Sequence, residues 1–151
     1  MLFILHQVNC QNAFGAGFAG YISKHAPHTK QDYHNWCKAH AKRGIKGAAL
    51  LGMFCCSTFD KDVQIVHLFS QNFYGNSRKT GKCYTDYEAM EFGISNLRMN
   101  YPDSTIICPQ YMGCGLAGGD WKIVSQILKK YNVIPCDKID LKNRVYHKAR
   151  G

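Results

Sequence analysis

Acidic residues are scarce in this chain. Only 10 of its 151 residues are Asp or Glu, against 19 Lys or Arg, which gives a formal net charge of +9. No carboxylate precedes Asp32, and none lies between Asp32 and Asp60. Because net charge bears on partners rather than on fold, this shortage favours an anionic partner, either a phosphate-bearing small molecule or a nucleic acid. Charge alone leaves both open.

Other features are missing as well, and each absence excludes a class of protein. Charged residues make up only 19% of the chain and hydrophobic residues 46%, a balance that excludes a disordered tail and a coiled coil. The sequence has no internal repeat and no apolar run long enough to cross a membrane. Met1 leads into an apolar run of only four residues, so we expect no signal peptide. These observations predict a cytoplasmic protein with no membrane partner.

The eight cysteines lie in apolar runs such as GMFCC and TIICP, which is typical of reduced core thiols rather than of disulfides. No C-x-x-C pair is present, only the adjacent Cys55 and Cys56 and an isolated His25-x-x-His28. Zinc sites need a fuller set of ligands at defined spacings. We therefore expect neither a metal nor another cofactor.

Hydrophobic periodicity predicts strands that alternate with helices, hence an α/β fold with a mixed or parallel sheet covered on both faces. The first helix should end at Lys24, and three further helices should begin with the capping signals Thr29, Thr85 and Asp120. The second and third strands should form an antiparallel pair around a turn over 57–62, and a basic tail should begin near Lys138. The expected strands cover 2–8, 48–56, 63–69, 104–109 and 132–139.

Two glycine-rich loops follow predicted strands, at the sheet edge where ligands of α/β proteins bind. Gly15, Gly17 and Gly20 form a G-x-G-x-x-G pattern at the start of a helix, where backbone N–H groups can hold a phosphate. A nicotinamide-binding unit would continue into a second strand that ends in an acid, whereas here a helix follows. A different diphosphate site and a simple tight turn remain as interpretations. The loop GCGLAGGDW, residues 113–121, repeats the pattern after another strand.

Two side chains near these loops are candidates for acid/base chemistry. His6 lies near the end of the first strand, close to Asn9 and the first loop, where an imidazole could serve a phosphate-bearing ligand. Filling of the core is the alternative role for a strand histidine. Asp120 precedes a helix and could be a simple N-cap or could take part in the chemistry.

Three motifs occur in an order that resembles the macrodomain family: HQVNCQNAFGAGFAGYISKHAP, FSQNFYGNSRKTGKCYTDYEAM and MGCGLAGGDW. The resemblance runs from about Leu5 to Tyr131 and is to the small branch that includes ADP-ribose 1''-phosphate phosphatases and ADP-ribosyl glycohydrolases. It implies a three-layer α/β/α macrodomain with a mixed sheet, which would fill residues 1–151 as a single domain. Macrodomains usually begin with one more strand, ending in an Asp that binds adenine, and this chain is expected to lack it.

The resemblance also implies roles for individual residues. His6 would activate water against the 1''-phosphate with Asp120 as its partner, and Asn9 would face the distal ribose. The other residues expected to contact ADP-ribose lie in the two glycine-rich loops and after the third strand: Gln11, Asn12, Gly15, Ala16, Gly17, Phe18, Gln71, Tyr74, Gly113, Cys114, Gly115, Leu116, Ala117, Gly118 and Gly119.

The primary functional hypothesis is therefore a hydrolase that removes the phosphate of ADP-ribose 1''-phosphate. A glycohydrolase that removes ADP-ribose from a protein or nucleic acid is the first alternative, with Lys79 or Lys82 as its nucleophile. The basic composition fits such a polyanionic partner. The second alternative is a non-catalytic protein that only binds ADP-ribose.

Overall fold

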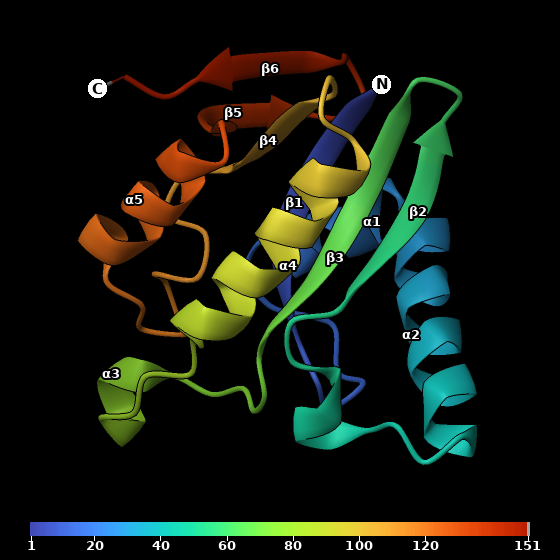
Figure 1. The fold of residues 1–151 in the computed structure, drawn as a ribbon, viewed down its shortest axis with the longest axis vertical. Helices are drawn as coiled ribbons and strands as arrows, with labels where there is room; N and C mark the ends of the chain where they lie inside the picture. Colours follow the sequence, from blue (N-terminus) through green and yellow to red (C-terminus); the bar gives the residue numbers. More distant parts are fainter. Residues whose placement is uncertain (151) are drawn as a thin grey trace.

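The computed structural model describes residues 1–150 and shows one six-stranded sheet with helices on both of its faces (Figure 1). In sheet order the strands are β2 (Phe54–Asp60), β3 (Val63–Gln71), β1 (Leu2–Asn9), β4 (Thr105–Pro109), β5 (Val133–Asp140) and β6 (Val145–Lys148). The helices are α1 (Phe18–His25), α2 (Pro27–Lys42), α3 (Ser77–Thr80), α4 (Tyr87–Asn100) and α5 (Trp121–Lys130), together with a 3-10 turn, η1 (Gly47–Leu50).

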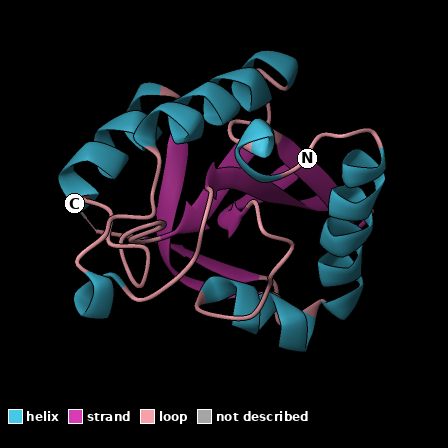
Figure 2. Cartoon of the chain, turned by 90° about the horizontal axis from the view of Figure 1, so that it is seen from below, coloured by secondary structure: helices cyan, strands magenta, loops and turns pink. Residues whose placement is uncertain are grey.

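The four inner strands are parallel, and the edge strands β2 and β6 are antiparallel to their neighbours. Successive residues of β1 face opposite cores: Ile4 packs with Tyr33 of α2, whereas Leu5 packs with Met90 of α4. Helices α1 and α2 therefore cover one face of the sheet, and α4 and α5 cover the other (Figures 1 and 2). The predicted three-layer arrangement around a mixed sheet is confirmed.

The predicted strand over 48–56 is wrong in its first half. Residues 47–50 form η1, and β2 begins only at Phe54 and runs through most of the segment predicted as a turn. Gly47 and Gly52 adopt positive φ angles of 57° and 87°, which interrupt an extended strand. The antiparallel pairing with β3 is confirmed, and the turn between the two strands is only Lys61 and Asp62.

Two predicted helix starts are also wrong. Helix α2 begins at Pro27 rather than Thr29, because proline tolerates the first helical position, where its missing N–H is not needed. The N-cap of α4 is Asp86 rather than Thr85, and the Asp86 carboxylate accepts a hydrogen bond from the Ala89 N–H at 2.9 Å. The N-cap role predicted for Asp120 at α5 is confirmed, since its side chain accepts from the Lys122 N–H.

The basic segment from Lys138 onward is not a tail. It forms the end of β5 and the strand β6, with Lys138 opposite His147 in an antiparallel pair. The turn between them is closed by Asp140, whose carboxylate accepts hydrogen bonds from Asn143. Arg144 follows this turn and forms an ion pair of 2.6 Å with Asp60 at the end of β2.

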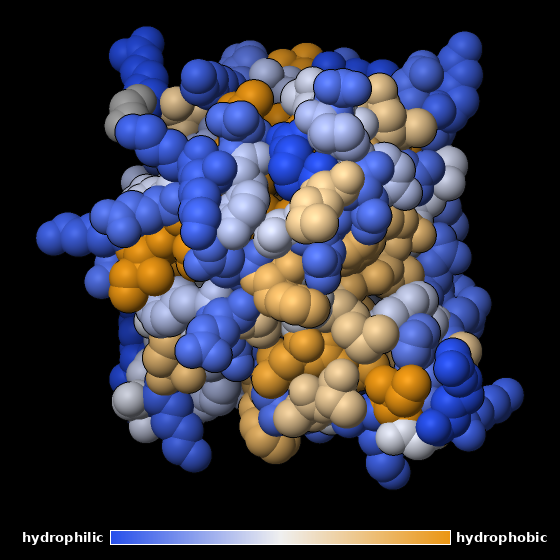
Figure 3. Space-filling view, in the orientation of Figure 1, coloured by the Kyte–Doolittle hydropathy of each residue, from blue (hydrophilic) through white to orange (hydrophobic). Residues whose placement is uncertain are grey.

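The outer surface carries exposed apolar side chains. Apolar side chains gather over the centre and lower half of the face shown in Figure 3, and α4 carries two exposed ones, Phe92 at 62% and Met99 at 74%. Within residues 1–150 no helix is long and apolar enough to cross a membrane.

All eight cysteines are free; five are buried, whereas Cys56 and Cys83 are exposed.

Candidate functional site

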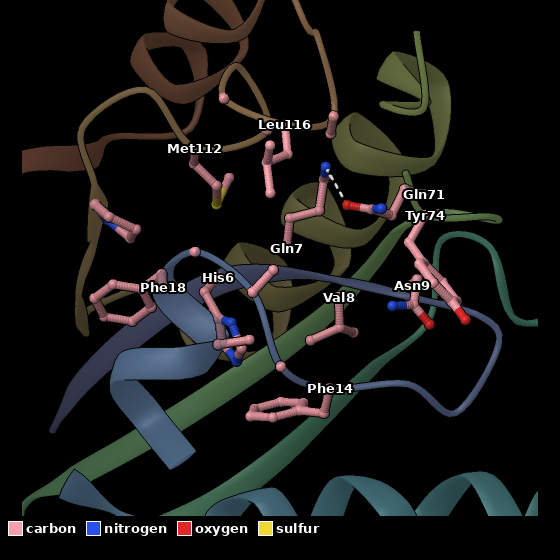
Figure 4. Close-up of a pocket in the computed structure, with 18 of the residues that line it drawn as sticks. His6, Gln7, Val8, Asn9, Phe14, Phe18, Gln71, Tyr74, Met112 and Leu116 are labelled. Carbon is pink, nitrogen blue, oxygen red and sulfur yellow. Dashed lines mark hydrogen bonds between the residues drawn. The ribbon is translucent and has the colours of Figure 1, made fainter. Parts of the chain in front are cut away.

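A cleft of about 670 Å³ opens where β1, β3 and β4 end, and it brings the two glycine-rich loops to face each other (Figure 4). Its volume lies in the range of ordinary small-molecule sites. The lining comes from residues 6–9, 13–19, 71, 74–76, 109–113 and 115–117. Most of the residues predicted to bind ligand line it: Asn9, Gly15, Ala16, Gly17, Phe18, Gln71, Tyr74, Gly113, Gly115, Leu116 and Ala117. The others do not: Gln11, Asn12, Cys114, Gly118 and Gly119.

The first wall of the cleft is a loop shaped by Asn9. The amide nitrogen of Asn9 donates to the Ala13 carbonyl at 2.7 Å, and its oxygen accepts from the Gln11 N–H at 2.9 Å. The Tyr33 hydroxyl donates to the Asn9 carbonyl at 2.8 Å, which ties the same residue to α2. Asn9 therefore lines the cleft while its amide organises the loop.

This loop ends at the start of α1 and presents free backbone donors there. Gly17, at φ +58°, is the N-cap residue, and the first turn of α1 contains no acidic side chain. The N–H groups of residues 15–19 donate to no other group of residues 1–150. Unpaired N–H groups at a helix N-terminus favour an anion. The loop is therefore suited to hold a phosphate or diphosphate.

The second wall is held in place by Gln7, for which no sequence motif predicts a role. The Gln7 amide nitrogen donates to Gln71 Oε1 at 2.8 Å (Figure 4) and to Thr85 Oγ1 at 3.0 Å. Its oxygen accepts from the Ser70 hydroxyl at 2.6 Å. The Thr85 hydroxyl in turn donates to the Gly113 carbonyl at 2.5 Å. A glutamine within the apolar run LFILHQV was the one signal that could have indicated this role.

The glycines of the second wall allow close approach between segments. At Gly113, φ is +76°, and a Cβ would lie 3.0 Å from both Gln7 Oε1 and Thr85 Oγ1. At Gly118 a Cβ would lie 2.5 Å from the Cβ of Ser77 on α3. Gly118 thus packs the loop against α3, away from the cleft, which explains why it does not line the cavity. The backbone supports the same packing, since the Ser77 N–H donates to the Leu116 carbonyl at 2.9 Å.

No Lys, Arg, Asp or Glu side chain lines the cleft in the part of the chain that the structure describes. The basic residues of the acid-poor opening third instead lie largely on α2 and the segment after it, with Lys30, Lys38, Lys42, Arg43 and Lys46. A negatively charged ligand would be met by backbone N–H groups and the α1 dipole rather than by counter-ions.

His6 lies at the floor of the cleft, between Phe14 and Phe18, with each ring centroid 5.7 Å from that of His6 (Figure 4). The side chain is buried, with only 1% of its surface exposed, and its Nε2 is 2.7 Å from Nδ1 of His67 on β3. Its Nδ1 has no hydrogen-bond partner within residues 1–150. Burial, and then the neighbouring His67, hold the pKa of His6 well below its ordinary value of 6.5. The ring is therefore neutral at pH 7.

The structure does not bring Asp120 or the two candidate lysines to His6. The Asp120 side chain is exposed, does not line the cleft and accepts from the Lys122 N–H at 2.9 Å as the cap of α5. No hydrogen bond joins Asp120 to His6 within residues 1–150. Lys79 and Lys82 are exposed, and Lys82 lines a separate hollow of about 580 Å³. No group of three or more metal-ligating side chains occurs within the described residues.

No family model and no curated protein matches this chain. Solved structures do match it. A Bacteroides thetaiotaomicron protein of unknown function aligns at 23% identity and a TM-score of 0.74, covering 86% of this chain and 79% of that one. A macrodomain protein from Streptomyces coelicolor aligns at 19% identity and 0.67, covering 89% and 84%. Thermosipho africanus DarTG, solved in complex with ADP-ribose, aligns at 18% identity and 0.64, covering 85% of this chain and 34% of the other.

Proposed function

The chain has the macrodomain fold, and from that premise we propose that its cleft binds ADP-ribose. A structural neighbour, DarTG, is solved with this ligand. The free N–H groups of residues 15–19 suit the diphosphate, and the absence of a carboxylate among the lining residues of the described chain avoids repulsion. The facing loop around Gly113 would enclose the ligand from the other side.

We further propose that the protein hydrolyses ADP-ribose 1''-phosphate to ADP-ribose and inorganic phosphate, with His6 as the acid/base residue. The observation that carries this proposal is the unpartnered Nδ1 of a buried, neutral His6 that lines the cleft. Nδ1 would take a proton from the attacking water as the new O–P bond forms. The bond between phosphorus and the ribose oxygen then breaks, and the ring returns the proton to that oxygen.

For Asp120 we propose a positioning role rather than direct action on the phosphate. Its carboxylate caps α5, and its backbone N–H donates to the Tyr87 hydroxyl at 2.9 Å. Both contacts fix the end of the loop over residues 113–119. Because asparagine caps a helix about as well as aspartate, Asp120→Asn should keep most of the activity, whereas Asp120→Ala should lower thermal stability by about 1 kcal/mol.

The test measures phosphate release from ADP-ribose 1''-phosphate and, separately, ADP-ribose binding by calorimetry. His6→Ala should lower kcat by about 10²- to 10⁴-fold, the range of one acid/base group, with a much smaller change in ADP-ribose affinity. Asp120→Asn is the matched control. Phosphate release that persists unchanged in His6→Ala would show that His6 has no catalytic role.

A non-catalytic ADP-ribose reader is the second candidate, favoured by the lack of any charged side chain among the cleft-lining residues of the described chain. Tight ADP-ribose binding without turnover of the 1''-phosphate or of ADP-ribosylated protein or nucleic acid would select it. The glycohydrolase alternative requires Lys79 or Lys82, which lie outside the cleft. Release of ADP-ribose that is lost in the Lys79→Ala, Lys82→Ala double variant would favour that activity instead.

A further inference from the structure

Three buried polar side chains form a continuous hydrogen-bonded chain across three neighbouring strands. Ser57 of β2 has its Oγ 2.9 Å from Nε2 of His67 on β3, and Nδ1 of His67 lies 2.7 Å from Nε2 of His6 on β1. Their exposed fractions are 1%, 0% and 1%. Within residues 1–150 the chain ends at Nδ1 of His6, a buried atom without a hydrogen-bond partner, on a residue that lines the cleft.

We propose that His67 is a positioning residue that holds His6 in the tautomer with its proton on Nε2, and that Ser57 holds His67 in turn. Nδ1 of His6, itself buried, is then the atom with the free lone pair, and a water that reacts there must first reach the floor of the cleft. This inference rests on the proposed function, because it assigns the orientation of the proposed base.

Hydrogen-bond accounting along the chain allows two arrangements of neutral rings. If the Ser57 hydroxyl donates to His67, then His67 donates to His6, and a buried N–H is left without an acceptor on His6 Nδ1. If Ser57 accepts from His67, each proton points the other way, His6 Nδ1 carries an unpaired lone pair, and the Ser57 hydroxyl proton needs another acceptor. The proton of a hydroxyl can rotate about the C–O bond to reach an acceptor, whereas the proton on a ring nitrogen is fixed in direction, and orphaned buried N–H groups are rarer than under-satisfied acceptors. The second arrangement is therefore favoured, and it is the one that a general base requires.

The partner of His6 is a neutral ring, whereas the histidine of a Ser-His-Asp triad has a carboxylate. When Nδ1 takes the proton from water, the Nε2 proton of His6 stays in its hydrogen bond to His67, so the added positive charge faces a lone pair. When the ribose oxygen leaves, it takes the proton from Nδ1 and the ring is neutral again. The other rings around the pair are Phe14, Phe18 and Tyr33, which give it an apolar surrounding.

The first test reads the tautomer directly and needs no substrate. Nitrogen-15 NMR of the unmodified protein at pH 7 distinguishes the proton-bearing from the bare ring nitrogen of each histidine. We expect His6 with its proton on Nε2 and a bare Nδ1. In His67→Leu, which removes the acceptor, we expect a mixture of tautomers at His6. A proton found on Nδ1 of His6 in the unmodified protein would overturn the proposal.

The second test is kinetic and uses a conservative rescue. His67→Leu should lower kcat for the 1''-phosphate by about 10- to 100-fold with little change in KM, a smaller loss than that of removing His6 itself. His67→Asn keeps a carbonyl oxygen that can accept from His6 Nε2, so it should recover most of that loss. The kcat of Ser57→Ala should lie between that of the unmodified protein and that of His67→Leu.

Ser23→Ala is the matched control, since it removes another serine hydroxyl that is hydrogen-bonded, to Ala19 of α1, outside the chain. Equal kcat values for His67→Leu and His67→Asn, with equal losses of thermal stability, would show that His67 only fills the core and would refute the kinetic part. If the unmodified protein releases no phosphate, the proposed function fails, while the nitrogen shifts still decide the tautomer.

Discussion

The buried histidine pair should make the fold sensitive to mild acid. Burial lowers the pKa of His67 from 6.5 to about 4, and the pKa of His6 is lowered in the same direction. In the unfolded chain both rings recover a pKa near 6.5. Between about pH 6.5 and 4 the unfolded state therefore binds protons that the folded state does not. The contribution of these two rings to the free energy of unfolding has its full value above about pH 6.5 and is lost as the pH falls through this window.

The size of the effect follows from the shift at His67. The pKa of His67 differs by about 2.5 units between the unfolded and the folded state. At about 1.4 kcal/mol per unit, this ring alone lowers the free energy of unfolding by about 3 kcal/mol between pH 7 and pH 4. Because native domains are stable by only about 5–15 kcal/mol, the loss is a large fraction of the total.

Urea unfolding curves at pH 7, 6, 5 and 4.5 measure this loss. The comparison protein is His67→Asn, which cannot titrate at this position and keeps every carboxylate, so the contributions of Asp60 and Glu91 cancel in the difference. We expect the unmodified protein to lose stability more steeply than the variant as the pH falls below 6.5. Parallel pH profiles for the two proteins would refute the reasoning.

Two further predictions concern the cleft, and a third concerns Arg98 near the C-terminal end of α4. ADP-ribose affinity should change less than about threefold between 50 and 500 mM NaCl, because no Lys or Arg of the described residues lines the cleft, and a tenfold loss by calorimetry would contradict this. Gly113→Ala should cost about 1–3 kcal/mol in thermal unfolding and weaken ADP-ribose binding, whereas Gly115→Ala, with nothing within 4 Å of its Cβ, should leave thermal unfolding unchanged. Arg98→Lys should also lower the free energy of unfolding by about 1–3 kcal/mol, because the guanidinium donates to several backbone carbonyls, including that of Ser104 at 2.6 Å. Arg78→Lys, on the exposed helix α3, is the control and should leave the melting temperature unchanged.

Much of the architecture followed from local patterns. The runs that became β1 and β4 are short and apolar, and Asp120 marked the start of α5 as predicted. The errors arose where the backbone takes an uncommon conformation, as at Gly52, or where a neighbouring residue made the better cap, as Asp86 did beside Thr85. Strand β6 was missed because its apolar residues are few and it is stabilised by pairing with β5.

The site was predictable where small residues mark it and unpredictable where distant side chains meet. The loops around Gly15 and Gly113 stood out by composition, and both line the cleft. The contact between His6 and His67 joins residues 61 positions apart, and it depends on the parallel register of β1 with β3. The hydrophobic pattern of a single strand does not determine its register with another strand. The contact between His6 and His67 is therefore seen only in the folded chain.

The hydrogen bonds of Gln7 bear on how the cleft would receive a ligand. Three side-chain hydrogen bonds join Gln7 to Gln71, Thr85 and Ser70, and through Thr85 they hold Gly113, all of them between groups of the protein itself. The conformational entropy of ordering this wall is therefore lost during folding rather than at the moment of binding. We therefore expect this side of the cleft to change little in conformation when a ligand binds.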